Sequence, residues 1–500
     1  MSNWPEQLNI DNHFLRERLA EGRGDRVALR LDDRDVTYLE VDRAASGFAS
    51  LLLEAGVERE DRVLIVMPDG LEFVGALFGT FRIGAVAVML NPGLTGEAMG
   101  AIALQSRAAA VVVDEQHLGH YQNSVGHMIE RPVEIVAHDR LELPHDEVAT
   151  VETAASDPAL WLFSGGTTGL PKAVVQTHRS YANTTELFGK GSLHYGGDDI
   201  VISVPKLYFG YATGCNLFFP FSVGASAILF DEKPTPEVLF DRIARHRPTV
   251  LVTVPSAINQ MLGSPDAGSQ DLSSLRIATS AGEALPETLY HQWKDTFGVE
   301  LLDGLGTAEM WHIFITNTVE DVKPGTLGKV VPGFEIKACD DEGNEVAVGE
   351  VGRLWVKGES IALGYWEDPE KTEETFRDHW VVGADLISID ADGYVTHRGR
   401  ADEAIKVKGK WFRPQEVESV LLDHVSVKDC AVVVVNDPAG LAKPVAFVVP
   451  SGDVEEQELI DWVLERLEPY KHPRRVYLVA DLPQTHLGKV DRTALKRLAD

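Results

Sequence analysis

Short runs of hydrophobic residues alternate with helically spaced segments over the first 300 positions of the chain. The runs at 62–68, 85–90, 108–114, 249–255 and 299–304 are rich in β-branched residues, which is typical of buried strands. Between the first two runs, residues 73–81 have the spacing of a helix. This alternation predicts a fold of layered α/β subdomains.

The pattern changes after about residue 324. Short strand-like segments at 335–338 and 352–358 are separated by Asp/Gly turns at 340–343 and 390–393, which predicts a small β-rich subdomain over 324–400. A new unit follows a boundary at 400–403. It has a helix near 414–422, strands at 431–435 and 444–449, a helix at 455–467 and a basic tail.

We therefore predict a large N-terminal domain over 1–400 and a small, mobile α+β C-terminal domain over 401–500. The alternative is that 403–500 forms another layer of the same domain.

The net negative charge of the chain limits the kinds of partner that it can bind. The 500 residues include 46 Lys+Arg and 77 Asp+Glu, a formal net charge of −31, and the excess lies almost wholly before residue 403. Nonspecific nucleic-acid binding and docking on anionic lipid both need clustered cations, so neither is expected. The near-neutral C-terminal part can still supply local cations for small polyanions.

The sequence shows no sign of a disulfide-rich, zinc-binding, secreted or membrane protein. Cys215, Cys339 and Cys430 are too widely spaced for a disulfide framework or a zinc site, which suits a reducing compartment. The first residues lack the basic and apolar regions of a secretory signal. No apolar run approaches the roughly 18–20 residues that span a bilayer. These features favour a cytoplasmic protein without membrane contact.

The segment 164–172 has the strongest chemical signal. Glycines allow a close backbone approach to a ligand, and neighbouring hydroxyls and N–H groups form an anion-binding nest. Lys172 adds a positive charge, so the segment suits the phosphates of a nucleotide. A flexible Gly/Thr turn is the alternative. The residues concerned are Ser164, Gly165, Gly166, Thr167, Thr168, Gly169 and Lys172.

Five further motifs follow in order: Ser280-Ala-Gly-Glu-Ala-Leu-Pro, Asp303-Gly-Leu-Gly-Thr-Ala-Glu, Val382-Gly-Ala-Asp, Gly399-Arg-Ala-Asp with Ile405-Lys-Val-Lys-Gly, and Pro483-Gln-Thr-His-Leu-Gly-Lys. Their order and spacing over nearly the whole chain resemble the adenylate-forming superfamily, which includes acyl- and aryl-CoA ligases. The resemblance implies activation of a carboxylic acid with ATP, followed by transfer to coenzyme A.

Phosphate and metal roles follow from the resemblance. It implies that Thr167, Thr168 and Lys172 hold the ATP phosphates, with Thr167 also catalytic. Glu309 would be catalytic through Mg²⁺, an ion that takes oxygen ligands and keeps several waters. Cations are needed because a carboxylate and a polyphosphate must meet, and preorganised charge best stabilises the transition state.

The resemblance also implies the nucleotide contacts. Adenine would bind beside Gly282, Glu283, Ala284, Asp303 and Gly304, and Thr307 would lie near the phosphates or the metal. Asp385 would accept hydrogen bonds from the ribose hydroxyls, and Arg400 would donate to the ribose. Lys489 would bridge the carboxylate and the α-phosphate as a catalytic residue.

Four positions depart from the family pattern. Gly165 replaces a common Ser/Thr, and Ala173 replaces a Gly after the lysine. Ala308 replaces the Thr that usually precedes the metal-binding Glu, which removes a hydroxyl that Thr307 or a water could supply. Leu305 stands where an aromatic residue often stacks on adenine.

The segments 204–214 and 307–314 resemble the benzoate-CoA ligase branch. Carried over by position, Tyr211, Gly306, His312 and Ile313 would contact the ring of the acid. Aromatic walls with small glycines make a flat slot that favours a planar ring. Core packing is the alternative role for these aromatics. An amino-acid substrate is disfavoured because 204–214 contains no carboxylate for its ammonium; aminobenzoates are not excluded.

Thioester formation needs a second arrangement of the site. The resemblance puts a hinge at Asp402, about which rotation would withdraw Lys489 and bring in 405–411, with Gly409 against the pantetheine arm. Competing hypotheses are a CoA ligase for medium-chain or cyclic aliphatic acids, a non-catalytic nucleotide-binding module and a luciferase-type oxygenase. A monomer or a homodimer is expected.

Overall fold

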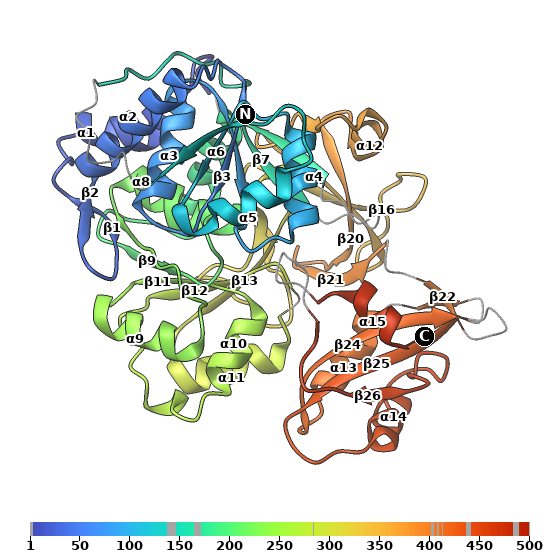
Figure 1. Ribbon diagram of the computed structural model, residues 1–500. Coiled ribbons are helices and arrows are strands. Elements are labelled where there is room, and N and C mark those ends of the chain that lie inside the picture. Colours follow the sequence, from blue (N-terminus) through green and yellow to red (C-terminus); the bar gives the residue numbers. More distant parts are fainter. Residues whose placement is uncertain are drawn as a thin grey trace.

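The computed structural model describes residues 4–137, 147–164, 172–283, 285–401, 405–407, 410–412, 414–436, 442–483 and 490–499 (Figure 1). Three sheets lie before residue 401, and a hairpin and a fourth sheet follow it. In these ranges no helix is both long enough and apolar enough to cross a membrane.

A seven-stranded sheet forms the first layer. Leu64 and Val66 pack with α4 and α5 on one face, whereas Val63 and Ile65 pack with α2 and α3 on the other. Strands covered on both faces read as continuous hydrophobic runs, which explains the pattern at 62–68 and 85–90. The strand order is β18 (Gly364–Tyr365), β8 (Lys172–Thr177), β7 (Pro158–Ser164), β4 (Val86–Leu90), β3 (Arg62–Val66), β5 (Ala110–Val113) and β6 (Val133–Val136).

The helices of this layer begin with capping side chains. Thr37 forms a capping box with Glu40 at the start of α2, and Asp114 accepts from the N–H of His117 in α5. The predicted helix at 73–81 corresponds to α3. The bounds are α1 (Glu17–Ala20), α2 (Tyr38–Glu54), α3 (Leu71–Arg82), α4 (Gly96–Ser106), α5 (Glu115–Val125) and α6 (His178–Thr184).

The second sheet has nine strands. Its central strands β9 to β13 are parallel, and Leu251 and Ala278 face α9, α10 and α11. The order is β15 (Lys329–Val330), β14 (Ile313–Thr316), β13 (Leu301–Gly306), β12 (Ile277–Ser280), β11 (Val250–Thr253), β9 (Ile200–Ser203), β10 (Ser226–Ile228), β1 (Val27–Arg30) and β2 (Asp35–Thr37). The helices are α7 (Gly210–Thr213), α8 (Phe219–Val223), α9 (Pro236–His246), α10 (Pro255–Leu262) and α11 (Glu287–Phe297).

A five-stranded antiparallel sheet accounts for most of the segment predicted to be β-rich. In β17 buried and less buried residues alternate, as expected for a sheet with one covered face. Two strands of the segment lie elsewhere, because β15 extends the nine-stranded sheet and β18 pairs with β8. The elements are β16 (Glu335–Cys339), β17 (Val351–Lys357), α12 (Pro369–Thr375), β19 (Phe376–Arg377), β20 (Trp380–Ile389) and β21 (Val395–Arg400).

The chain after residue 401 forms a separate core of its own. Its strands β24 and β25 are antiparallel and are packed on both faces, by Phe412, Val417 and Leu459 on one side and by Leu495 on the other. The predicted basic tail also contains a strand and a helix. The bounds are β22 (Ile405–Val407), β23 (Lys410–Phe412), α13 (Pro414–Leu422), β24 (Val427–Asn436), β25 (Ala442–Pro450), α14 (Glu456–Leu464), β26 (Val476–Leu478) and α15 (Arg492–Ala499).

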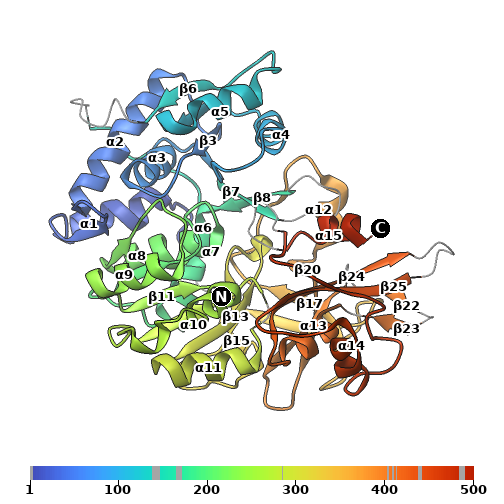
Figure 2. The same ribbon diagram turned by 60° about the horizontal axis from the view of Figure 1, so that its bottom comes forward.

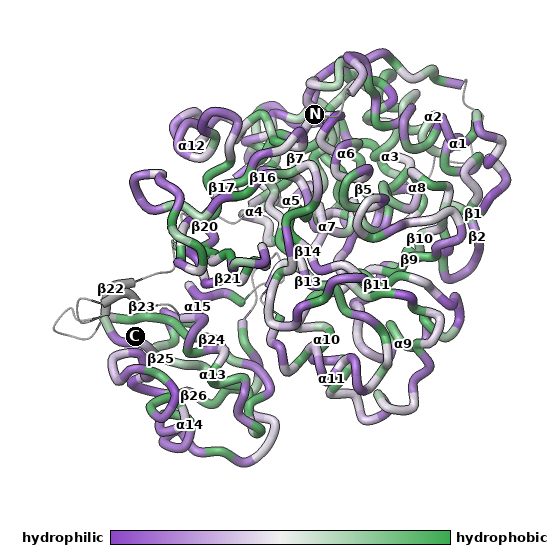
Figure 3. Tube along the Cα trace, turned by 180° about the vertical axis from the view of Figure 1, so that it is seen from behind, coloured by the Kyte–Doolittle hydropathy of each residue, from purple (hydrophilic) through white to green (hydrophobic). Residues whose placement is uncertain are grey.

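The C-terminal part lies beside the β-rich sheet, below β20 and β21 in Figure 1 and to the right of α10 and α11 in Figures 1 and 2. Asn259 of α10 donates a hydrogen bond to the carbonyl of Lys428 in β24 at 2.8 Å, so it also contacts the nine-stranded layer. Hydrophobic residues concentrate in the central strands, while the outer loops and α12 are hydrophilic (Figure 3).

Candidate functional site

Parallel strands of the nine-stranded sheet end at a common edge. Ser280 at the end of β12 pairs in register with Asp303 in β13. Burial raises the pKa of Asp303 to about 8, since only the Ser280 hydroxyl and the Gly304 N–H act against it. Asp303 Oδ1 is buried and makes no hydrogen bond within the described ranges. Burial therefore favours the protonated form of Asp303 near pH 7, and its Oδ1 has no protein partner among the described residues. Ligand sites at this edge are common in α/β sheets.

Tyr211 and His312 are held together across this edge. The Tyr211 hydroxyl donates to Thr279 Oγ1 at 2.7 Å, and the Tyr211 carbonyl lies 3.1 Å from His312 Nε2. His312 is buried, and burial lowers its pKa to about 3. The imidazole is therefore neutral. Because a carbonyl only accepts, Nε2 carries the proton and donates to Tyr211.

Glycines make this close packing possible. A Cβ on Gly306 would lie 2.4 Å from the carbonyl oxygen of His312, and one on Gly304 would lie 2.8 Å from that of Ile315. A Cβ on Gly214 would come within 2.4 Å of His312 Nε2. These three positions leave no room for a side chain, so the backbone of β13 lies directly against His312 and the buried Ile313.

Aromatic rings surround His312 on its inner side. Phe188, Phe219 and Trp311 have ring centroids at 5.4, 4.9 and 5.3 Å from the imidazole. All three rings are buried. Some of the aromatic residues in this region, Phe188, Phe219 and Trp311, therefore belong to the core. They hold the imidazole ring of His312 in place.

The predicted phosphate segment begins and ends in two paired strands. Ser164 closes β7, Lys172 opens β8, and the two residues are direct partners. The ammonium of Lys172 lies 5.6 Å from the centre of the Tyr365 ring. The predicted residues Gly165, Gly166, Thr167, Thr168 and Gly169 lie outside the described ranges.

Glu309 lies in a short 3-10 turn over Ala308–Met310, directly after Thr307. The Tyr365 hydroxyl donates to Glu309 Oε1 at 2.7 Å, and the Gln176 side-chain amide donates to the Ala308 carbonyl. The Thr307 hydroxyl is buried and has no protein partner among the described residues. Nowhere in the described chain do three His, Cys, Asp or Glu side chains form a group suited to a metal. Within the described residues, a metal at Glu309 would thus have fewer than three such side chains as ligands.

Asp385 and Arg400 face each other across β20 and β21. Arg400 Nη1 lies 3.8 Å from Asp385 Oδ1, and His397 Nε2 lies 3.1 Å from the same oxygen. Asp385 is buried and Arg400 is partly exposed. The two residues predicted to hold a ribose therefore already form a polar pair, on a different sheet from Asp303.

The remaining predicted positions are only partly described. Gly282 has a φ of +88°, a conformation that favours glycine, and Glu283 Oε2 accepts from the Ser256 N–H at 3.1 Å. Ala284, Asp402, Gly409 and Lys489 lie outside the described ranges.

Sequence reasoning missed three residues that hold the site together. Thr279 accepts from Tyr211, Gln176 bonds the turn before Glu309, and Tyr365 bonds Glu309 itself. Thr279 and Gln176 lie within strands, where no local pattern distinguishes them from core residues. Tyr365 follows the glycine of a Gly-Tyr pair, and only its pairing with β8 brings it close to Glu309.

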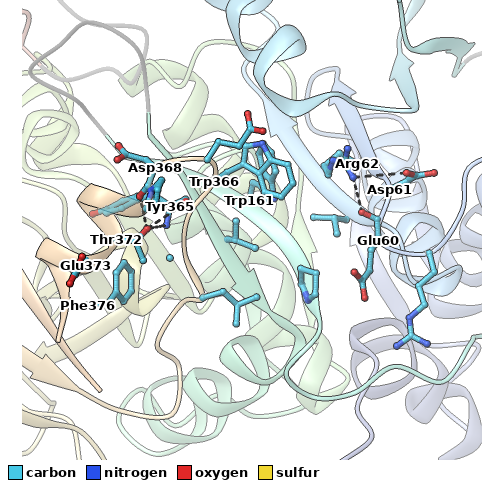
Figure 4. Close-up of a pocket in the computed structure, with 18 residues that line it drawn as sticks. Glu60, Asp61, Arg62, Trp161, Tyr365, Trp366, Asp368, Thr372, Glu373 and Phe376 are labelled. Carbon is cyan, nitrogen blue, oxygen red and sulfur yellow. Dashed lines mark hydrogen bonds and ion pairs between the residues drawn. The ribbon is translucent and has the colours of Figure 1, made fainter. Parts of the chain in front are cut away.

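A separate cavity of about 730 Å³ lies between residues of the β-rich segment and the seven-stranded sheet (Figure 4). Its lining includes Pro158 and Val86, which begin β7 and β4, at the opposite ends of these strands from the phosphate segment. Trp161 and Trp366 lie against each other there, with Arg62 over the Trp366 ring. Tyr365 lines this cavity with its ring and bonds Glu309 with its hydroxyl.

Comparison with known families identifies the class of protein. Residues 16–366 match the AMP-binding enzyme family, and residues 416–489 match the AMP-binding enzyme C-terminal domain. The chain belongs to this family, as the ordered motifs predicted, and the predicted α/β fold with a small C-terminal domain is confirmed.

Individual relatives are similar over nearly their full length. A benzoate-CoA ligase of Thauera aromatica is 36% identical over 510 residues, covering 98% of this chain and 96% of the relative. A crystal structure of a benzoate CoA ligase from Burkholderia xenovorans LB400 is 36% identical, with a TM-score of 0.90 and coverage of 98% and 99%. An anthranilate CoA ligase in complex with anthranoyl-AMP is 34% identical, with a TM-score of 0.93 and coverage of 100% and 98%.

Proposed function

We propose that this enzyme is an AMP-forming aryl-CoA ligase. It activates a benzoate-type acid with ATP to an acyl-adenylate and pyrophosphate, and then transfers the acyl group to coenzyme A, releasing AMP. The observation that carries the proposal is the near full-length similarity to benzoate- and anthranilate-CoA ligases. The neutral aromatic wall around Tyr211 and His312 supports it independently.

The two-step route follows from the chemistry of a carboxylate. A thiol cannot displace oxide, whereas AMP is a competent leaving group. Formation of the adenylate brings two anions together, so preorganised cations and N–H groups have to stabilise the encounter. We assign Ser164 to Gly169 and Lys172 to the phosphates, and Lys489 to the bridge between the carboxylate and the α-phosphate.

The donor set at Glu309 fits Mg²⁺. Carboxylate ligation without a cluster of three His, Cys, Asp or Glu side chains among the described residues suits a hard cation that keeps several waters and is bound partly through the phosphates of its substrate. When bound, Mg²⁺ would neutralise charge on the phosphates. Glu309 would hold it, and the buried Thr307 hydroxyl, which lacks a protein partner among the described residues, is available to a phosphate or a water. This role offsets the missing hydroxyl at Ala308.

The nucleoside would bind across the edges of two sheets. Asp303, beside Gly304, offers an unbonded carboxyl oxygen to the adenine edge, and Gly282 to Ala284 line the slot. Asp385 and Arg400 would exchange part of their mutual contact for the ribose hydroxyls. Because Asp385 already accepts from charged or polar neighbours, its carboxylate remains a preorganised acceptor.

The acid would bind with its ring against Tyr211, Gly306, His312 and Ile313. Burial lowers the pKa of His312 to about 3, so its imidazole presents no positive charge to the ring of the acid. An α-ammonium would be buried without a counter-ion at a cost of several kcal/mol, whereas a benzoate ring or the uncharged amine of an aminobenzoate has no such cost. Planar ring acids therefore fit best.

For thioester formation we propose that 401–500 acts as a mobile domain on 1–400, with the hinge at Asp402. Rotation would withdraw Lys489 and bring Gly409 against the pantetheine arm. Separate hydrophobic cores on the two sides of residue 401 support the division, because few contacts then need to break.

The test is ATP–pyrophosphate exchange over benzoate, hydroxy-, amino- and halobenzoates, cinnamate and octanoate, followed by CoA-dependent release of AMP. We expect exchange with benzoate-type acids and thioester formation with CoA. Preference for octanoate would instead favour an aliphatic acid ligase. ATP binding without pyrophosphate release for any acid would contradict the enzymatic function.

A further inference from the structure

The turn that carries Glu309 is fixed along one flank by residues 360–365 of the β-rich segment. The Ser360 hydroxyl donates to the Met310 carbonyl at 2.9 Å, and the Ala362 N–H donates to the Glu309 carbonyl at 2.9 Å. The Tyr365 hydroxyl donates to Glu309 Oε1 at 2.7 Å. The same short segment therefore holds both the backbone and the carboxylate of Glu309.

Tyr365 is itself rigidly placed. It pairs with Val174 of β8, and its N–H donates to Thr372 Oγ1 at 3.0 Å. Its ring packs edge-on against Phe376 at 5.7 Å, and in Figure 4 the ring stands at the wall of the cavity beside Thr372. Since β8 begins at Lys172, Tyr365 connects the strand of the phosphate segment directly to Glu309.

The bond from Tyr365 settles how the carboxylate is used. A carboxylate oxygen only accepts, so the Tyr365 hydroxyl is the donor in this 2.7 Å bond. A hydrogen bond to an ionised acceptor is among the stronger kinds. It occupies Oε1 and leaves Oε2 without a hydrogen bond from the described residues.

We propose that Tyr365 is a positioning residue that orients the Glu309 carboxylate, so that Oε2 is presented to the metal–ATP complex. The inference rests on the proposed role of Glu309 in holding Mg²⁺. Partners that orient a ligating side chain restrict its rotamers and raise its affinity for the metal, typically by 10- to 100-fold. Tyr365 is not among the residues assigned to the acid or to the pantetheine arm, so its effect is expected to be confined to the metal-dependent adenylation step.

The experiment is a Tyr365→Phe substitution, which removes the hydroxyl and keeps the ring over Lys172. Mn²⁺ binding to the enzyme with α,β-methylene-ATP is measured by electron paramagnetic resonance, and the Mg²⁺ dependence of pyrophosphate exchange is measured separately. We expect both half-saturation concentrations to rise about tenfold, the equivalent of about 1.4 kcal/mol. The KM for the acid and thioester formation from supplied benzoyl-AMP should stay unchanged.

Tyr290→Phe is the matched control, because the Tyr290 hydroxyl donates to Glu300 Oε1 at 2.6 Å away from Glu309. It should leave Mn²⁺ binding at the wild-type value. Unchanged or tighter Mn²⁺ binding in Tyr365→Phe would overturn the proposal, and so would an equal loss in both tyrosine variants.

Glu309→Gln separates this inference from the function on which it rests. If Glu309→Gln abolishes Mn²⁺ binding and Tyr365→Phe does not weaken it, only the positioning role falls. If Glu309→Gln binds Mn²⁺ normally, the metal role of Glu309 is wrong, and the role of Tyr365 falls with it. Loss of adenylation with every ring acid in the wild-type enzyme would refute the proposed function instead.

Discussion

Asp303→Asn is expected to make the stability of the enzyme less dependent on pH. Asp303 is buried without a cationic partner, and its pKa rises from 3.8 to about 8. Its folded pKa lies above its unfolded pKa, so its stabilising contribution is complete below about pH 4 and is lost as pH rises toward 8. Asparagine has nearly the same shape and does not titrate, so the variant lacks this loss.

The magnitude follows from the difference in bound protons. Between pH 5 and 7 Asp303 is protonated in the folded chain and ionised in the unfolded chain, which costs about 1.4 kcal/mol per pH unit. Relative to the wild type, the variant should therefore gain about 3 kcal/mol of stability between pH 5 and pH 7. With an unfolding entropy of about 2.1 cal/mol/K per residue, this corresponds to about 3 °C in Tm for a chain of 500 residues.

The assay is thermal unfolding of both proteins at pH 5, 6 and 7 without ligands. Asp199→Asn is the control. Burial opposes ionisation of Asp199, but hydrogen bonds from Arg276 and Thr249 lower its pKa overall. The Tm difference between this variant and the wild type should therefore not change between pH 5 and 7. A constant Tm difference between Asp303→Asn and the wild type would refute the reasoning. It would mean that Asp303 is ionised in the folded enzyme.

Three further substitutions test the catalytic cycle. Lys489→Ala should abolish adenylation and largely spare thioester formation from supplied acyl-adenylate; equal loss of both steps would contradict two conformations. Asp402→Pro should stiffen the hinge and slow only thioester synthesis, and if both rates survive, 402 is not the pivot. Gly306→Ala should raise the KM for the acid at least tenfold, because the new Cβ would lie 2.4 Å from the His312 carbonyl oxygen. Gly119→Ala, whose new Cβ would meet nothing within 4 Å, should leave this KM unchanged. An unchanged acid KM in Gly306→Ala would remove Gly306 from the pocket.

Much of the layered fold could be predicted from local pattern. The hydrophobic runs at 62–68 and 85–90 became β3 and β4, and the spacing at 73–81 became α3. These elements are readable because both faces of the strands are covered, so their composition depends little on which strand is the neighbour. Element ends were less accurate: the run predicted at 299–304 forms a strand over Leu301–Gly306.

Pairing between distant segments could not be predicted. β15 and β18 belong to the segment expected to be β-rich, yet each joins a larger sheet. Such two-residue strands have no periodicity of their own, and their partners are fixed by where the chain returns in space. The bond between Tyr365 and Glu309 depends on this return, so no spacing in the sequence indicates it.

The sequence by itself determined the enzyme family, because its ordered motifs place glycine, hydroxyl and charged residues at spacings that suit a bound nucleotide. Only the tertiary structure decided the protonation states and orientations of the catalytic and binding side chains. Burial, which depends on every neighbour, makes His312 neutral and favours the protonated form of Asp303, and a strand from the β-rich segment holds the carboxylate of Glu309.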